Sequence, residues 1–121
     1  MIMFCKTSLH RSDPDVAPDY LTVSSSGPAA DNQSRYMGVY QLTETVLNNF
    51  PVYKMLGSNN SIYVHNKGYW SVFNELNPND RDIYHRNNDP TPPVPPASGW
   101  RYWHGEWDYD YYLTVTARGK N

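Results

Sequence analysis

Short apolar segments built around tyrosine and tryptophan recur along this chain, and glycine, proline, asparagine or aspartate separates each from the next. The segments are YLTVSSS directly after Asp19, YMGVYQL (36–42), FPVYKML (50–56), SIYVHN (61–66), GYWSVFNEL (68–76) and RDIYHR (81–86). Aromatic and β-branched side chains pack well on the pleated surface of a sheet, and turn residues end a strand. Each segment therefore predicts a short β-strand, and together they predict an all-β fold.

Two of the connections between these segments have the length of hairpin loops. They are residues 57–60 (GSNN) and 66–68 (NKG). Because short loops join antiparallel neighbours, we expect the three segments between residues 50 and 76 to form a consecutive antiparallel meander. Only residues 43–49 (TETVLNN) have a helical character, and their two threonines and one valine limit it to one turn.

The C-terminal third contains a proline-rich segment followed by a dense aromatic one. Residues 89–99 (DPTPPVPPASG) hold five of the ten prolines, which predicts an extended crossing segment rather than a strand. After it we expect an aromatic strand from Trp100, a turn near His104 and Gly105, and a closing strand at 109–116. A meander of about seven or eight such short strands hides its faces and edges by curling into a barrel-like sheet or forming a sandwich.

The length of the chain fits one domain. At 121 residues it is large enough to enclose a core and too small for two independently stable units. Residues 7–18 (TSLHRSDPDVAP) mix serine, aspartate and proline without an apolar period, which predicts a flexible leader at residues 1–18. We therefore expect a single all-β domain at 19–117 and a short tail at 118–121.

Composition disfavours several classes of partner. The chain has a net charge of −2 and a pI near 6.0. A protein that binds nucleic acid usually carries an excess of positive charge, so a nucleic acid partner is disfavoured. No apolar stretch is long enough to span a bilayer, so no membrane partner is predicted. The single Cys5 excludes an internal disulfide framework and leaves the compartment undetermined. The sequons at Asn32 and Asn59 would be glycosylated only in a secreted parent protein.

Three histidines lie at expected strand ends. His65, His85 and His104 could bind a transition metal together with Asp80 or Asp82 if their loops converged. Their spacing matches no metal motif, and a histidine at a strand end is more often a surface or hydrogen-bonded residue. The sequence therefore predicts neither a metal nor another cofactor.

Three carboxylates alternate in the aromatic segment, and they are the only candidates for catalysis. Glu106, Asp108 and Asp110 are two residues apart, so we expect them to line one side of a strand. A pair of such acids could carry out glycoside hydrolysis. Like charges on one face more often mean a solvated surface, and no nucleophile or nucleotide-binding motif is present. We therefore predict a non-enzymatic protein.

The order of the motifs carries a resemblance to a known kind of module. The pattern is a first strand, a Gly-x-Tyr strand, a Pro-x-Tyr strand, a Tyr-rich hairpin with a tryptophan and a proline-rich turn ending in Gly-Trp, given in order by LTVSSSG, YMGVYQL, FPVYKM, SIYVHNKGYWSVF and TPPVPPASGW. This pattern resembles a small β module of large multidomain proteins of protists and invertebrates. The resemblance covers about residues 20–104. It implies an accessory, non-catalytic module and carries over no site residues.

The aromatic segment after the prolines contains the candidate binding residues. They are Trp100, Tyr102, Trp103, His104, Trp107, Asp108 and Tyr109. Alternate residues of a strand point outward, so some of these rings should be exposed, although the core and the prolines could absorb others. We expect an interaction module whose aromatic face binds a protein partner or a neighbouring domain of the parent chain. The alternative is a lectin-like carbohydrate-binding module with Trp103, Trp107 and Tyr109 as platforms, and a hydrolase built on Glu106 and Asp108 is a third hypothesis.

Overall fold

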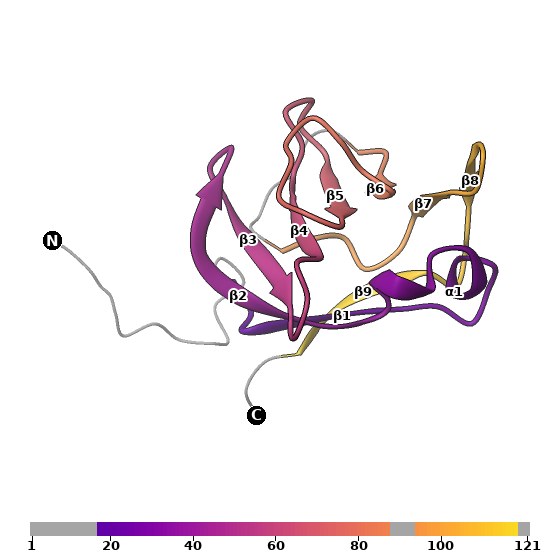
Figure 1. The fold of residues 1–121 in the computed structure, drawn as a ribbon, viewed down its shortest axis with the longest axis horizontal. Coiled ribbons are helices and arrows are strands. Elements are labelled where there is room, and N and C mark those ends of the chain that lie inside the picture. Colours follow the sequence, from indigo (N-terminus) through magenta and orange to yellow (C-terminus); the bar gives the residue numbers. More distant parts are fainter. Residues whose placement is uncertain (1–16, 88–93, 119–121) are drawn as a thin grey trace, which may run out of the picture.

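One curled antiparallel sheet makes up almost the whole of the described structure (Figure 1). The structure is a computed structural model, and it describes residues 17–87 and 94–118. Within these ranges the strands are β1 (Tyr20–Ser24), β2 (Gly38–Leu47), β3 (Phe50–Met55), β4 (Ser61–Val64), β5 (Trp70–Phe73), β6 (Ile83–His85), β7 (Trp100–Trp103), β8 (Trp107–Tyr109) and β9 (Thr114–Arg118). A short helix α1 (Ala29–Asn32) and a 3₁₀ turn η2 (Ser34–Tyr36) connect β1 to β2. No helix in the described ranges is long and apolar enough to cross a membrane.

The strand order is that of a meander with a returning last strand. Each strand from β1 to β7 pairs with the strand that follows it, and β9 returns to pair with β1, which gives the order β8-β7-β6-β5-β4-β3-β2-β1-β9. The predicted all-β antiparallel meander is confirmed, including the consecutive strands β3, β4 and β5. The sheet curls into a half-barrel, so the sandwich alternative is not formed. Figure 1 shows β1 and β9 lying opposite β5 and β6.

The proline-rich segment crosses beside the last strand. The Val115 amide on β9 donates to the Ala97 carbonyl at 3.0 Å, and the Trp100 indole donates to the Pro96 carbonyl at 2.8 Å. Residues 94–99 form no strand, as predicted, whereas residues 88–93 lie outside the described ranges. This segment therefore covers part of the otherwise free edge of β9.

Tyrosine and tryptophan rings fill the concave side of the sheet. The core consists of Leu21, Val23, Ala29, Tyr36, Tyr40, Tyr53, Ile62, Val64, Trp70, Val72, Ile83, Trp100, Tyr102, Leu113 and Val115. Two of the core hydroxyls have backbone partners, since Tyr40 donates to the Tyr36 carbonyl at 2.8 Å and Tyr53 donates to the Pro18 carbonyl at 2.7 Å. Burial raises the pKa of both phenols, so they remain protonated donors.

The helical turn expected at residues 43–49 is wrong. This segment continues β2 to Leu47, and Leu47 pairs with Phe50 across a tight turn. Asn48 and Asn49 make that turn with φ values of 54° and 72°, a conformation that asparagine tolerates better than most residues. Cross-strand pairing outweighs local propensity here. The one helical turn lies instead at α1, directly after Pro28, a residue suited to the first turn of a helix.

Candidate functional site

The convex side of β5 to β8 carries a continuous group of rings, which we call the aromatic surface. It consists of Tyr69, Tyr84, Trp103, Trp107 and Tyr109, together with the side chains of Arg81 and Arg101. Strand alternation places them there, because Trp70, Val72, Ile83 and Tyr102 point into the core. The register supports this assignment, since Tyr84 lies opposite Arg101, Arg101 opposite Tyr109 and Trp103 opposite Trp107.

The rings of this surface touch one another from strand to strand. The ring centroids of Tyr69 and Tyr84 are 4.9 Å apart, those of Tyr84 and Trp107 are 4.8 Å apart, and those of Trp107 and Trp103 are 5.2 Å apart. Edge-to-face and tilted pairs of this kind stabilise each other beyond simple burial. The row extends to His65, which stacks on Tyr69 at 4.7 Å. The rings therefore hold fixed positions relative to one another.

Arg81 reaches this surface on the loop between β5 and β6. The Tyr63 hydroxyl donates to the backbone carbonyl of Asp80 at 2.7 Å, and the backbone amide of Asn66 donates to the Pro78 carbonyl at 2.8 Å. These bonds fix the loop across β4 and β5. The Arg81 guanidinium consequently lies over three rings, 5.3 Å from the centroid of Tyr69, 4.7 Å from that of Tyr84 and 4.8 Å from that of Trp107.

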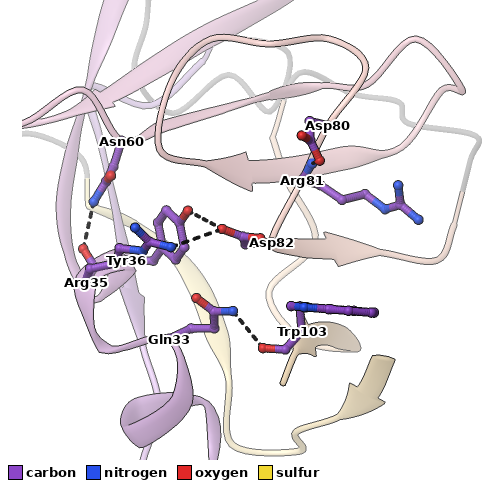
Figure 2. Close-up of polar contacts among 8 residues, drawn as sticks. All are labelled: Gln33, Arg35, Tyr36, Asn60, Asp80, Arg81, Asp82 and Trp103. Carbon is purple, nitrogen blue, oxygen red and sulfur yellow. Dashed lines mark hydrogen bonds and ion pairs between the residues drawn. The ribbon is translucent and has the colours of Figure 1, made fainter. Parts of the chain in front are cut away.

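Asp82 connects the aromatic surface to the η2 turn. Its carboxylate accepts the Tyr36 hydroxyl at 2.6 Å and lies 3.6 Å from the Arg35 guanidinium (Figure 2). Burial and the hydrogen bond to Asp82 raise the pKa of Tyr36, so this phenol stays a donor. The Asp82 carbonyl accepts the Trp103 amide at 3.0 Å, and the Gln33 side chain donates to the Trp103 carbonyl at 2.6 Å. The backbone that carries Trp103 is therefore held from two sides.

A shallow hollow opens between the loop and the end of β7. Its volume is about 290 Å³, and it is lined by Asp80, Arg81, Asp82, Trp103 and Trp107. Figure 2 shows the Arg81 side chain extending away from Asp82, above the indole of Trp103. A larger hollow of about 470 Å³ lies elsewhere, on the β2–β3 hairpin and its following turn. That larger hollow is lined by none of the aromatic rings, so we consider the smaller one the better candidate site.

The structure divides the predicted binding residues into two groups. Trp103 and Tyr109 are 41% and 40% exposed, and Trp107 is partly exposed beside them. Trp100 and Tyr102 are 0% and 3% exposed, so their assignment as binding residues is wrong. The physical reason is strand alternation, which turns Trp100 and Tyr102 inward and Trp103 outward.

His104 and Asp108 lie apart from the aromatic surface. The His104 ring stacks on Tyr102 with 5.0 Å between centroids, and its Nε2 is 3.4 Å from an Asp108 carboxylate oxygen. Asp108 pairs with Tyr102 in the register, so it alternates with Trp107 and Tyr109. Its Oδ1 accepts the backbone amide of Tyr109 at 2.8 Å. Asp108 thus caps an N–H group of the edge strand β8 instead of facing a ligand on the convex side.

The three alternating carboxylates do not share one environment. Glu106 and Asp108 are exposed, but Asp110 is buried and accepts hydrogen bonds from the Ser25 hydroxyl and the Ala29 amide. The expectation of one solvated face is therefore wrong for Asp110. A general acid for glycoside hydrolysis needs a desolvated carboxyl, which neither Glu106 nor Asp108 provides.

The three histidines do not converge on one point. His65 packs on Tyr69, His85 packs against Trp100 with ring centroids 5.6 Å apart, and His104 packs on Tyr102. In the described part of the chain, no group of three or more His, Cys, Asp or Glu residues is placed to hold a metal ion. The aromatic surface is consequently the candidate site that the residues themselves support.

Two residues of this surface were not among the predicted binding residues. Tyr84 and Arg81 were expected only as part of the strand segment 81–86, yet both lie on the convex side. The alternation of Tyr84 with the inward Ile83 is a signal that could have placed Tyr84 outside. No local signal predicts the packing of Arg81 on Trp107, because 26 positions of chain separate them.

Comparisons of the chain with protein-family models, with curated protein sequences and with solved structures found no match.

Stability is expected to fall as the pH decreases from about 7.5 to about 5.5, because His65 is buried in its neutral form. Burial lowers the pKa of its imidazole, and the charges of Arg81 and Lys67 act in the same direction, whereas the Asn79 backbone and the Asp80 carboxylate oppose them. An unfolded histidine titrates near about 6.5, so below that value the unfolded chain binds more protons than the folded one. This contribution is complete above about 6.5 and is lost as the pH falls toward the lowered pKa of the folded state.

Urea denaturation at the two pH values measures this effect. The variant His65→Phe keeps a ring on Tyr69 and removes the titrating group, so it should lose less stability at the lower pH. The variant should keep part of the pH dependence, because burial also lowers the pKa of His85. Equal loss in the variant and the wild-type protein would assign the effect to other groups.

Proposed function

We propose that this protein is a non-catalytic interaction module whose aromatic surface binds another protein or a neighbouring domain of its parent chain. The observation that carries this proposal is the exposure of rings beside stacked guanidinium groups. Trp103, Tyr109 and Tyr111 are exposed, and Tyr111 stacks on Tyr109 at 5.5 Å. Tryptophan, tyrosine and arginine are the residues that most often dominate the binding energy of protein interfaces.

The edge strand β8 favours recognition by side chains over strand addition. Its Tyr109 amide already donates to the Asp108 carboxylate, so that amide is not free to pair with an added strand. The strand is also only three residues long. A partner would therefore gain most of its contacts from the rings on the convex side.

A protein partner fits the rings better than a sugar does. A sugar platform needs an open ring face, but the Arg81 guanidinium lies over Trp107 and the Arg101 guanidinium lies 4.7 Å from the Tyr109 centroid. Among the described residues no guanidinium stacks on Trp103, which lines the hollow. Two of the three platform residues of the carbohydrate hypothesis thus have a guanidinium over the ring.

Affinity capture with quantitative mass spectrometry, from an extract of the cells that make the protein, tests the proposal. We expect at least one protein to be enriched by the wild-type chain and lost with Trp103→Ala. The loss should exceed about tenfold, because an anchoring tryptophan at an interface centre contributes roughly 2 kcal/mol or more. Val46→Ala is the matched control, since Val46 is exposed on β2, away from the aromatic surface.

Two results would contradict the proposal. One is a set of captured proteins that Trp103→Ala leaves unchanged while the variant remains folded. The other is specific binding on a glycan array that Trp103→Ala abolishes, which would favour the carbohydrate-binding hypothesis.

A further inference from the structure

Two guanidinium groups on the aromatic surface stack on rings without pairing with an acid. Arg81 lies over Tyr84 and Trp107, and Arg101 lies over Tyr109. Neither makes an ion pair with a carboxylate among the described residues. The Nε atoms of both arginines are buried and lack a hydrogen-bond acceptor within the same part of the chain. The terminal nitrogens of the two guanidinium groups are not among the buried unpaired atoms, so an acidic ligand would contact the arginines there.

The carboxylates near these arginines are engaged elsewhere. Asp82 binds the Tyr36 hydroxyl and faces Arg35, and Figure 2 shows Arg81 pointing away from it. One Asp80 carboxylate oxygen accepts the backbone amide of Arg81 at 2.8 Å. Asp108 alternates with the outward rings and caps the edge strand. The guanidinium groups therefore remain available for an acid from outside the described chain.

Packing on rings prepares these side chains for binding. A free arginine loses rotamer entropy when it forms a hydrogen bond, but one already held against rings loses less. A guanidinium also presents paired N–H donors that match the two oxygens of a carboxylate. Arg81 lies over the Tyr84 ring, and Tyr84 is the register partner of Arg101, so the two arginines belong to the same part of the surface.

We propose that the aromatic surface recognises an acidic segment of a protein, whose carboxylates pair with Arg81 and Arg101 while neighbouring apolar groups pack on Trp103. This inference rests on the proposed function and specifies the chemistry of the partner. The arginines supply the charge complementarity, and Trp103 supplies the exposed apolar contact beside them.

Nuclear magnetic resonance titration of ¹⁵N-labelled protein with poly-L-glutamate tests this inference. We expect the Nε–H resonances of Arg81 and Arg101 and the indole resonance of Trp103 to shift. The binding should weaken when salt rises from about 50 to about 300 mM, because exposed charges are screened. Arg81→Gln and Arg101→Gln should each weaken binding at least about fivefold, the loss expected for one charge-assisted contact.

Matched variants separate charge, shape and folding. Lys54→Gln removes one exposed positive charge from β3 and should leave the affinity unchanged. Arg81→Lys keeps the positive charge but loses the planar guanidinium with its paired N–H donors, so it should weaken binding less than Arg81→Gln does. Thermal denaturation checks that the variant is folded. No shift at either Nε, or an equal effect of Lys54→Gln, would overturn the inference. Tighter binding to polygalacturonate than to poly-L-glutamate would assign the site to an acidic glycan and would also overturn it.

The capture and titration experiments together distinguish a failure of the acidic-segment inference from a failure of the proposed function. If Trp103→Ala abolishes protein capture but the two Arg→Gln variants do not reduce it, the surface binds proteins and the acidic segment is refuted. If Trp103→Ala leaves protein capture intact, the proposed function fails whatever the titration shows.

Discussion

Asp110→Ala is expected to lower the free energy of unfolding by roughly 3 to 5 kcal/mol, the range for removing a buried charged acceptor from its donors. The carboxylate is 1% exposed. It accepts the Ser25 hydroxyl at 2.6 Å, the Ala29 amide at 2.9 Å and the Tyr112 amide at 2.8 Å. Alanine would leave these donors unpaired, and Ala29 is fully buried. Such a loss is a large fraction of the about 5 to 15 kcal/mol that stabilises a small domain.

The position of Asp110 in the fold explains the size of this effect. Residues 110–113 connect β8 to β9, which lie at opposite ends of the strand order. Asp110 joins this connection to the segment that follows β1, so it holds the two ends of the curled sheet together. Gly27 allows the approach, because a Cβ atom there would overlap an Asp110 carboxylate oxygen. Gly27→Ala should therefore destabilise the protein through the same contact.

Urea denaturation and thermal melting measure the change. The melting temperature of Asp110→Ala should fall by roughly 10 °C or more, given the size of the described domain. Asp108→Ala is the matched control, since Asp108 is exposed and should change stability by less than about 1 kcal/mol. Equal destabilisation by the two substitutions would show that burial of Asp110 does not determine its contribution.

Trp100→Ala is expected to destabilise the fold by about 3 to 5 kcal/mol, the usual cost of truncating a buried aromatic side chain. Trp100 is 0% exposed, donates to the Pro96 carbonyl and packs against His85. Alanine would leave a cavity in the core and remove the bond that holds the proline-rich segment. We expect a lower urea midpoint with an unchanged dependence on denaturant concentration.

Trp103→Ala is the control for this prediction, because it is the same substitution on the opposite face of β7. Trp103 is 41% exposed, and the bonds to its backbone amide and carbonyl persist in alanine. Its stability should change by less than about 1 kcal/mol. A larger loss for Trp103→Ala than for Trp100→Ala would contradict the assignment of one ring to the core and the other to the surface.

Most of the strands could be predicted from the sequence because their signals are local. Turn residues and aromatic side chains indicate the strands β3, β4 and β5. The loops between these strands are short, and strands joined by short loops pair antiparallel. The C-terminal end of β2 was harder to predict. Val46 and Leu47 belong to the strand because they pair with Pro51 and Phe50 of β3. The α1 turn was missed, because four residues after a proline carry little helical signal of their own.

The candidate site could be predicted only in part. The dense aromatic segment indicated the correct region, but it did not say which rings face outward, because a shift of one residue exchanges the two faces of a strand. Trp100 and Tyr102 were therefore named as binding candidates together with the outward rings, although both are buried. Asp110 was grouped with Glu106 and Asp108 by spacing, although its partners lie more than 80 positions away in the chain.

Alternation and turn chemistry act between near neighbours, so the pattern of residues was enough to predict an antiparallel all-β meander rich in strand-forming rings. The choice of a curled sheet over a sandwich, and the role of Asp110 in joining its ends, emerge only in the folded structure. The tertiary structure also brought Arg81 from one loop onto Trp107 from another strand. These contacts form because the curvature of the sheet brings segments that are far apart in the chain next to each other. A pattern of neighbouring residues carries no signal for such contacts.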